Sequence, residues 1–169
     1  MSAATEPRAP CTIRVERGLS AVDDAMRAAE RALSGCSDEC CEAVLLAVAE
    51  LSQNLIKYAS RQSQPYAGTI SVDFDADRVR VRAKNSIESS EDSAHVADLI
   101  AKLSLPETVP KELYRVRLRE LLETPTPART RLGLLRLANE GGFRLSCKLG
   151  PAELEIIAER HCDGSRPPG

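Results

Sequence analysis

Hydrophobic residues recur most regularly at residues 43–60, where the sequence reads AVLLAVAELSQNLIKYAS. They return at steps of three and four, which places them on one face of an α-helix. Ser37 precedes the pattern as a candidate N-cap, so we predict one long helix from there to the end of this stretch. A shorter helix is predicted at residues 21–33, with Ser20 as its N-cap.

The hydrophobic period then changes from that of a helix to that of a strand. Residues 69–75 and 78–83 alternate apolar and polar side chains around a short turn, which predicts a β-hairpin. Residues 12–16 are predicted as a first strand, and residues 143–149 and 154–159 as the last two, joined by a Gly-Pro turn. The hairpin residues expected to share one face are Ile70, Val72, Phe74, Val79 and Val81.

Three helical segments are predicted after the hairpin. They lie at residues 93–103, at residues 111–123, and from Arg131 to the pair Gly141-Gly142. Helices interspersed with hairpins predict an α+β fold, a two-layer sandwich with helices on one face of a mainly antiparallel sheet.

One domain accounts for most of the chain. We expect it at residues 12–160, with a helical insertion at about 91–123 in place of a lid. Residues 1–11 are expected to be a disordered lead and residues 161–169 a flexible tail.

Composition narrows the classes of function. The 169 residues are 43% hydrophobic and 28% charged, with a net charge of −2, and include three Tyr, two Phe and no Trp. Nucleic-acid binding needs clustered positive charge or aromatic stacking platforms, so we do not expect nucleic acid as a partner. We do not expect a membrane as a partner either, because the sequence has no long apolar run. There is no run of about 18 apolar residues and no apolar leader, which predicts a cytoplasmic protein.

Six cysteines are present, and Cys36, Cys40 and Cys41 are clustered. Cytoplasmic cysteines are rarely paired, so we expect half-buried thiols rather than disulfides. A zinc site at the cluster would need a fourth ligand, for which Cys162 and His161 are candidates.

Three polar residues interrupt the apolar pattern of the long helix: Glu50, Asn54 and Lys57. Glu50 and Asn54 are four residues apart, so they stack on the same side of the helix. Beside a phosphate, the Glu could hold or polarise a water, and the Asn carbonyl could ligate Mg²⁺. The same spacing is common on the polar face of an amphipathic helix, so the residues alone leave both interpretations open.

Three segments together resemble a known superfamily. They are AELSQNLIKYA at residues 49–59, VRVRAKNSI at 79–87 and RLGLLRLANEGGFRLSCKLGPAELEI at 131–156. In this order they are similar to the N-box helix, the strand that enters the adenine loop, and the GLGL helix of the GHKL (histidine-kinase-like) ATPases. Within that superfamily the chain most resembles the anti-sigma-factor serine kinases, and especially their SiaB-like relatives, which share a helical segment before the GLGL helix.

This resemblance implies ATP and Mg²⁺ as cofactors. Glu50 matches the catalytic residue that polarises the nucleophile, and Asn54 matches the Mg²⁺ ligand. The GLGL segment matches a loop that offers backbone N–H groups to phosphates at a helix N-terminus. The residues implied in cofactor binding are Asn54, Lys57, Asn85, Arg131, Leu132, Gly133 and Leu134.

The nucleotide motifs also depart from the family pattern. The adenine loop D-x-G-x-G reads NSIES, so Asn85 replaces the Asp and both glycines are absent. A neutral hydrogen bond contributes about 1 kcal/mol against about 1.5–3 for a charged one, so this change alone weakens nucleotide binding roughly tenfold. Arg131 stands where a Gly is expected and is either a phosphate ligand or a surface charge.

Three functions fit these observations. The resemblance implies a bacterial signalling regulator, an ATP- and Mg²⁺-dependent protein serine kinase acting on an anti-sigma-factor-antagonist (STAS) partner in a partner-switching pathway. The alternative is a non-catalytic pseudo-kinase module that sequesters a protein partner without ATP. In a third interpretation the chain is a structural helix–sheet domain, and Glu50 and Asn54 are incidental. A homodimer is compatible with each.

Overall fold

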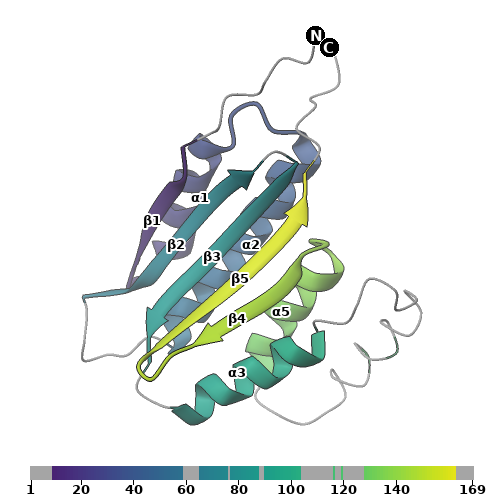
Figure 1. The fold of residues 1–169 in the computed structure, drawn as a ribbon. Helices are drawn as coiled ribbons and strands as arrows, with labels where there is room; N and C mark the ends of the chain where they lie inside the picture. The colour runs from purple at the N-terminus through teal and green to yellow at the C-terminus, as the bar shows by residue number, and fades with distance from the viewer. Residues whose placement is uncertain are drawn as a thin grey trace.

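A computed structural model of the chain describes residues 9–58, 65–75, 77–87, 90–103, 116, 119 and 128–162. Its strands form one sheet in the order β1-β2-β3-β5-β4, and every neighbouring pair is antiparallel (Figure 1). The strands are β1 (Cys11–Glu16), β2 (Tyr66–Asp75), β3 (Arg78–Ser86), β4 (Arg144–Leu149) and β5 (Glu153–His161).

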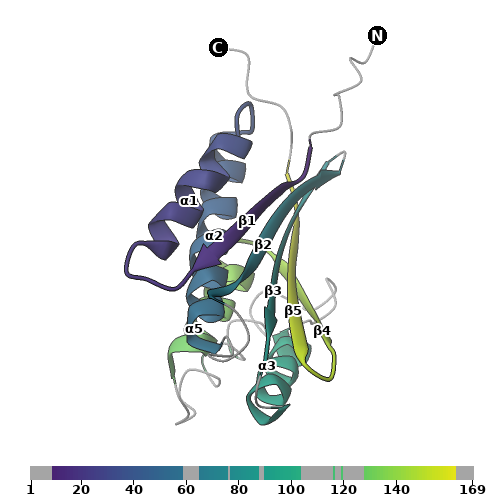
Figure 2. The same cartoon turned by 90° about the vertical axis from the view of Figure 1, so that its left-hand side faces the viewer.

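Helices cover one face of this sheet. Figure 2 shows α1, α2 and α5 on the same side, while α3 packs at the end of the sheet beside β4. The predicted two-layer α+β architecture is therefore confirmed. The described helices are α1 (Ala21–Ala32), α2 (Asp38–Tyr58), α3 (Ser90–Leu103) and α5 (Ala128–Asn139).

The core lies between the two layers and follows from the alternation of the strands. Val72 of β2 pairs directly with Val81 of β3, and both are fully buried. The apolar face of α2, including Val48 and Leu51, is fully buried against this side of the sheet. Burying such aliphatic side chains contributes about 1.5–3 kcal/mol each, which explains why the long apolar helix lies at the centre of the helical layer.

The hairpin is longer than the sequence pattern predicts. β3 was expected to end at Ala83, with Asn85 in the following loop, but the strand continues to Ser86. The reason is tertiary, because β5 pairs with its last residues and places Asn85 opposite Leu154. Asn85 therefore lies in a strand, on the helix-facing side.

Helix ends also differ in detail from the sequence expectation. The Ser37 hydroxyl accepts a hydrogen bond from the Cys40 N–H at 3.3 Å, which confirms it as the N-cap of α2. Ser20 is the N-cap residue of α1 as predicted, but its hydroxyl donates to the Asp24 carboxylate at 2.9 Å and makes no capping bond to the backbone. The helix predicted from Arg131 begins earlier, at Ala128.

Several predictions fall outside the described residues. These are residues 1–8 of the expected lead, residues 163–169 of the expected tail, most of the predicted helix at 111–123 and the end of the long helix beyond Tyr58. The expected lead and tail were each too long, because Cys11 begins β1 and His161 ends β5. None of the helices in the described part of the chain is both long and apolar enough to cross a membrane.

The cysteines are not all thiols. Cys40, in the first turn of α2, and Cys162, directly after β5, form a disulfide across a sequence separation of 122 residues. The expectation of six thiols is therefore wrong, because the fold brings together two cysteines whose proximity no local pattern reveals. Cys11, Cys36, Cys41 and Cys147 remain partly buried thiols.

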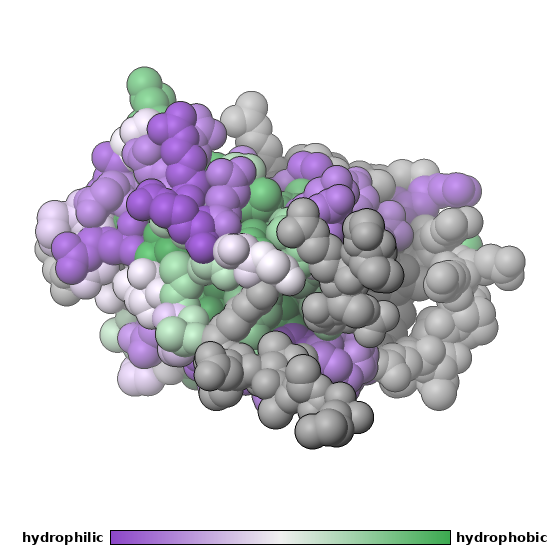
Figure 3. All heavy atoms as spheres, turned by 90° about the horizontal axis from the view of Figure 1, so that it is seen from above, coloured by the Kyte–Doolittle hydropathy of each residue, from purple (hydrophilic) through white to green (hydrophobic). Residues whose placement is uncertain are grey.

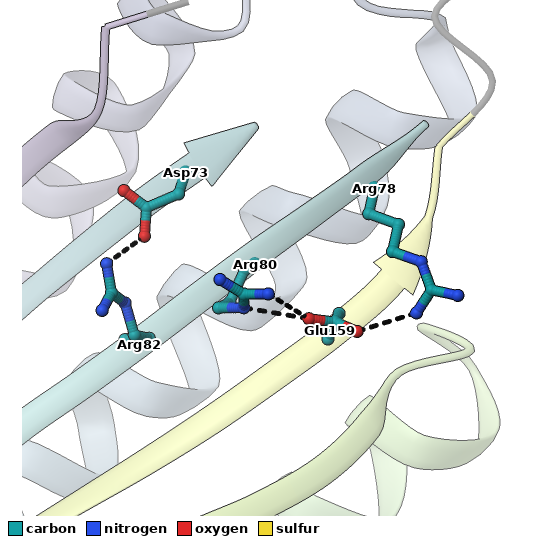
Figure 4. A network of polar contacts seen from close by, with 5 residues as sticks. All are labelled: Asp73, Arg78, Arg80, Arg82 and Glu159. Atoms are coloured by element: carbon teal, nitrogen blue, oxygen red, sulfur yellow. Dashed lines mark hydrogen bonds and ion pairs between the residues drawn. The ribbon is translucent and has the colours of Figure 1, made fainter. Parts of the chain in front are cut away.

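The face of the sheet away from the helices carries a network of charged side chains. Figure 4 shows Arg78 and Arg80 of β3 directed at Glu159 of β5, and Arg82 directed at Asp73 of β2. The Arg80 and Arg78 guanidinium groups hold the pKa of the Glu159 carboxyl below its ordinary value of 4.5, although partial burial opposes them. The network joins the three central strands on the side that the helices leave open.

This network predicts a small acid-dependent loss of stability. Because the pKa of Glu159 is lowered in the folded state, its stabilising contribution is present above pH 4.5 and is lost as the pH falls through the lower folded value. The pairs are partly exposed, so we expect less than about 1 kcal/mol. Urea denaturation at pH values from 7 to 3 measures the free energy of unfolding. It should fall less steeply with decreasing pH for Glu159→Gln than for the unmodified protein. Equal slopes would contradict the assignment.

Candidate functional site

Helix α2 carries two buried polar residues on its inner side. Glu50 and Asn54 are each 8% exposed, in a helix whose other buried residues are almost all apolar. Burying a carboxylate or an amide is unfavourable unless each finds a partner. The surroundings of these two side chains therefore decide what the helix can do.

Glu50 is held by the helix that packs against it. The Arg136 guanidinium of α5 donates to Glu50 Oε1 at 2.6 Å, and the Glu50 side chain is 11% exposed. Arg136 also contacts Glu140 one turn later at 3.3 Å, so the guanidinium is held between two carboxylates. Such a bond is charge-assisted on both sides and satisfies the carboxylate from within the chain.

Gly133 permits this close approach of α5. A Cβ at Gly133 would lie 2.5 Å from Glu50 Oε2, which no side chain could occupy without moving the carboxylate. Arg136 is one turn after Gly133, so both positions lie on the face of α5 that meets Glu50. Together they close the surroundings of this carboxylate.

Asn54 lies one turn further along α2, in a different environment. It lines a cavity of about 10 Å³ together with Asn85, and the remaining walls are mainly apolar. Its Nδ2 is among the buried polar atoms that have no hydrogen-bond partner in the described part of the chain. Asn85 Nδ2 donates to its neighbour's carbonyl, at Ser86, at 3.3 Å. The other lining residues are Leu51, Leu55, Tyr58, Ala83, Val96, Leu154 and Ile156.

The structure thus divides the predicted site residues into groups. Glu50 lies with Gly133, and Asn54 lies with Asn85. Lys57 belongs to neither group, because its side chain is exposed and its ammonium lies 5.1 Å from the centre of the Tyr58 ring.

The predicted phosphate loop lies inside a helix. Arg131, Leu132, Gly133 and Leu134 all follow Ala128, where α5 begins. Only the first four N–H groups of a helix lack an internal partner, so those of Gly133 and Leu134 are directed at carbonyls within α5. The Leu134 side chain is fully buried in the core. The phosphate-binding role of these residues stays a prediction.

Arg136 is the site residue that the sequence did not reveal. The sequence offers one weak signal, the spacing of Arg136 and Glu140 by four residues, which is also common on solvated helix faces. Only the packing of α5 on α2 brings its guanidinium to Glu50, which is 86 positions away in the chain.

A sequence model of one family matches the chain. It is described as histidine kinase-like ATPase domain and matches residues 15–108, more than half of the 169 residues. This chain belongs to the histidine kinase-like ATPase family. The match contains the end of β1, then α1, α2, the β2–β3 hairpin and α3, and it therefore includes Glu50, Asn54 and Asn85. No curated protein matches the chain.

Family membership establishes an ATP-binding fold, and the residues present can be tested against that ligand. In the resemblance, the adenine base would lie by Asn85 and the Mg²⁺ by Asn54. The space between these residues is about 10 Å³, roughly one water, whereas ligand sites usually measure about 300–1,000 Å³. Among the described residues, the space shared by Asn54 and Asn85 is too small to hold a nucleotide base, and ATP and Mg²⁺ binding stay predictions.

The unpartnered amide of Asn54 predicts an unusual effect on stability. A buried donor without an acceptor costs about 1–3 kcal/mol, and Leu is apolar and similar in size. We therefore expect Asn54→Leu to raise the free energy of unfolding by about 1 kcal/mol. Urea denaturation measures this change, and Ser52→Ala, which removes another buried polar group without a partner among the described residues, is the matched comparison. A destabilised Asn54→Leu protein would instead show that the amide is satisfied.

Proposed function

We propose that this protein is a signalling regulator that acts by binding a protein partner, with its nucleotide site closed in the resting state. The partner class suggested by the resemblance is a STAS-type antagonist. In this proposal the histidine kinase-like fold supplies a rigid scaffold, and binding does not require ATP.

One observation carries this proposal: α5 packs against Glu50, the position to which the resemblance assigns catalysis. Arg136 neutralises Glu50 at 2.6 Å, and Gly133 packs directly against the same carboxylate. A general base needs a carboxylate that can reach a substrate proton, and an internal ion pair competes with that role. Further along α2, apolar side chains close the space beside Asn54.

A second candidate function is favoured by a different observation. The Asn54 amide is buried without a partner among the described residues, and such groups are often retained for function. In this candidate the protein is an ATP- and Mg²⁺-dependent serine kinase. Asn54 would hold the metal and Glu50 would assist the substrate hydroxyl once α5 withdraws Arg136. The group supplied by ATP would be the transferred phosphoryl.

Calorimetric titration with Mg²⁺-ATP at millimolar concentration separates the two candidates. We expect no Mg²⁺-dependent heat with the unmodified protein. We also expect it to bind a STAS-domain protein with the same affinity in the presence and absence of nucleotide. Mg²⁺-dependent heat that disappears in Asn54→Ala would contradict the proposal and favour the kinase. Phosphate transfer to a partner serine would then establish the activity.

Arg136→Ala tests whether the closure by α5 can be released. If the variant binds Mg²⁺-ATP and the unmodified protein does not, the ion pair is an autoinhibitory lock on an active site. If neither binds, the site is closed by its apolar walls as well. Arg144→Ala is the matched control for loss of a positive charge. Arg144 lies on β4, on the face of the sheet away from the helices.

A further inference from the structure

The Cys40–Cys162 disulfide is buried at the edge of the core, with Cys40 2% and Cys162 7% exposed, and it borders an open hollow. Both cysteines line a hollow of about 370 Å³, together with Ser37, Glu39, Arg160 and His161. This volume lies within the usual range of small-molecule sites, about 300–1,000 Å³. The hollow lies where β5 ends, and Figure 3, seen from this end, shows hydrophilic residues gathered around a smaller hydrophobic area.

One wall of this hollow carries an arginine, Arg160, which is paired with a glutamate of the same lining. Arg160 donates to the Glu39 carboxylate at 2.7 Å and to the Gly141 carbonyl at 2.8 Å. The Glu39 side chain is 81% exposed, so its ion pair is a weak surface pair that a competing carboxylate can replace. The Arg160 side chain is only 15% exposed, which keeps the guanidinium in a fixed position.

The two sulfur atoms are not equivalent. Cys40 lies in the first turn of α2, where the helix dipole and the terminal N–H groups stabilise a thiolate. Asp38 and Glu39 lie in the same turn and oppose this effect, although Glu39 is paired with Arg160. Cys162 is the more exposed of the two, at 7% against 2%. Both residues line the hollow, and Cys162 is the less enclosed of the two, so we assign the attack to Cys162 and the departure to Cys40 at the helix N-terminus.

We infer that this disulfide is a thiol-exchange site, and that its ligand is a small thiol carrying carboxylate groups. A carboxylate of the ligand binds Arg160, and the ligand thiolate attacks Cys162 Sγ. The Cys40–Cys162 bond breaks, its electron pair leaves on Cys40 as a thiolate, and a mixed disulfide forms on Cys162. A second ligand thiol attacks the ligand sulfur of that mixed disulfide. The protein is thereby reduced to two thiols, and two ligand thiols are oxidised to one disulfide.

The remaining cysteines support exchange rather than a fixed framework. A structural framework pairs most of its cysteines, whereas here only two of the six are paired. Cys36 and Cys41 are thiols close in sequence to Cys40, and burial raises the pKa of the Cys147 thiol, which makes it less reactive. This inference does not depend on the proposed function, because it concerns the other end of α2.

The test uses the folded full-length protein and two small thiols. Reduced glutathione carries two carboxylates, and cysteamine carries an amine and none. At equal thiolate concentrations, glutathione should open the disulfide roughly tenfold faster, the effect of one charge-assisted contact. Acid quenching, alkylation and mass spectrometry should place the transient mixed disulfide on Cys162.

Variants keep this test decisive. Arg160→Gln should abolish the preference for glutathione and Arg160→Lys should restore part of it, while Arg27→Gln on α1 should leave it unchanged. Equal rates with both thiols, a mixed disulfide on any other cysteine, or opening only under denaturing conditions would each overturn the inference. If Arg160→Gln does not fold, the comparison of the two thiols on the unmodified protein still decides the question.

Discussion

Replacing both Cys40 and Cys162 by Ala should lower the melting temperature by roughly 10 °C. The disulfide closes a loop of 122 residues, and loops of this size restrict the unfolded chain by about 3–5 kcal/mol. For a domain of this length, 1 kcal/mol corresponds to about 2–4 °C. Thermal unfolding followed by circular dichroism, with the protein oxidised, measures the effect.

Two comparisons identify the origin of that loss. A reductant added to the unmodified protein should reproduce the lower melting temperature and should not change the double variant. Cys147→Ala, which removes a partly buried thiol outside the disulfide, should shift the melting temperature much less. A double variant that melts within about 2 °C of the oxidised protein would mean that the disulfide adds little beyond the core.

Gly133→Val should destabilise the protein by about 1–3 kcal/mol, and Glu50→Ala should largely remove that cost. The added Cβ would lie 2.5 Å from Glu50 Oε2, so α5 must move away from α2 or the carboxylate must leave Arg136. When Glu50 is Ala, the space of the carboxylate receives the new side chain. Urea denaturation of the two single variants and the double variant gives the coupling energy directly.

A matched glycine controls for the change in backbone freedom. Gly18 has no atom within 4 Å of an added Cβ, so Gly18→Val should cost much less than Gly133→Val. Additive effects of Gly133→Val and Glu50→Ala would show that α5 does not press on the carboxylate. That result would also remove the main support for a closed catalytic position.

Much of the fold could be predicted because its signals are local. The apolar face of α2 and the alternation of β2 and β3 are periodic patterns that one window of sequence contains, and both elements form as expected. Their ends were less predictable. β3 extends to Ser86 because β5 pairs with it, and that pairing depends on a strand far along the chain.

The candidate site was predicted only in part for the same reason. The spacing of Glu50 and Asn54 on one helix left their role open, the resemblance singled them out, and the family match includes both. Their surroundings were not recognisable, because Arg136 reaches Glu50 across 86 positions of sequence. Asn85 was expected in a loop. The pairing of β3 with β5 instead places it in a strand, where it lines the same cavity as Asn54.

The sequence by itself determined the kind and order of the main elements, the two-layer class and the helix that carries the polar pair, since hydrophobic periodicity acts between near neighbours. The tertiary structure alone decided that Glu50 is paired and that the space beside Asn54 is about the size of one water. It also decided that Cys40 bonds to Cys162. Each of these depends on distances between residues far apart in the chain, which the folded packing fixes and no local pattern records.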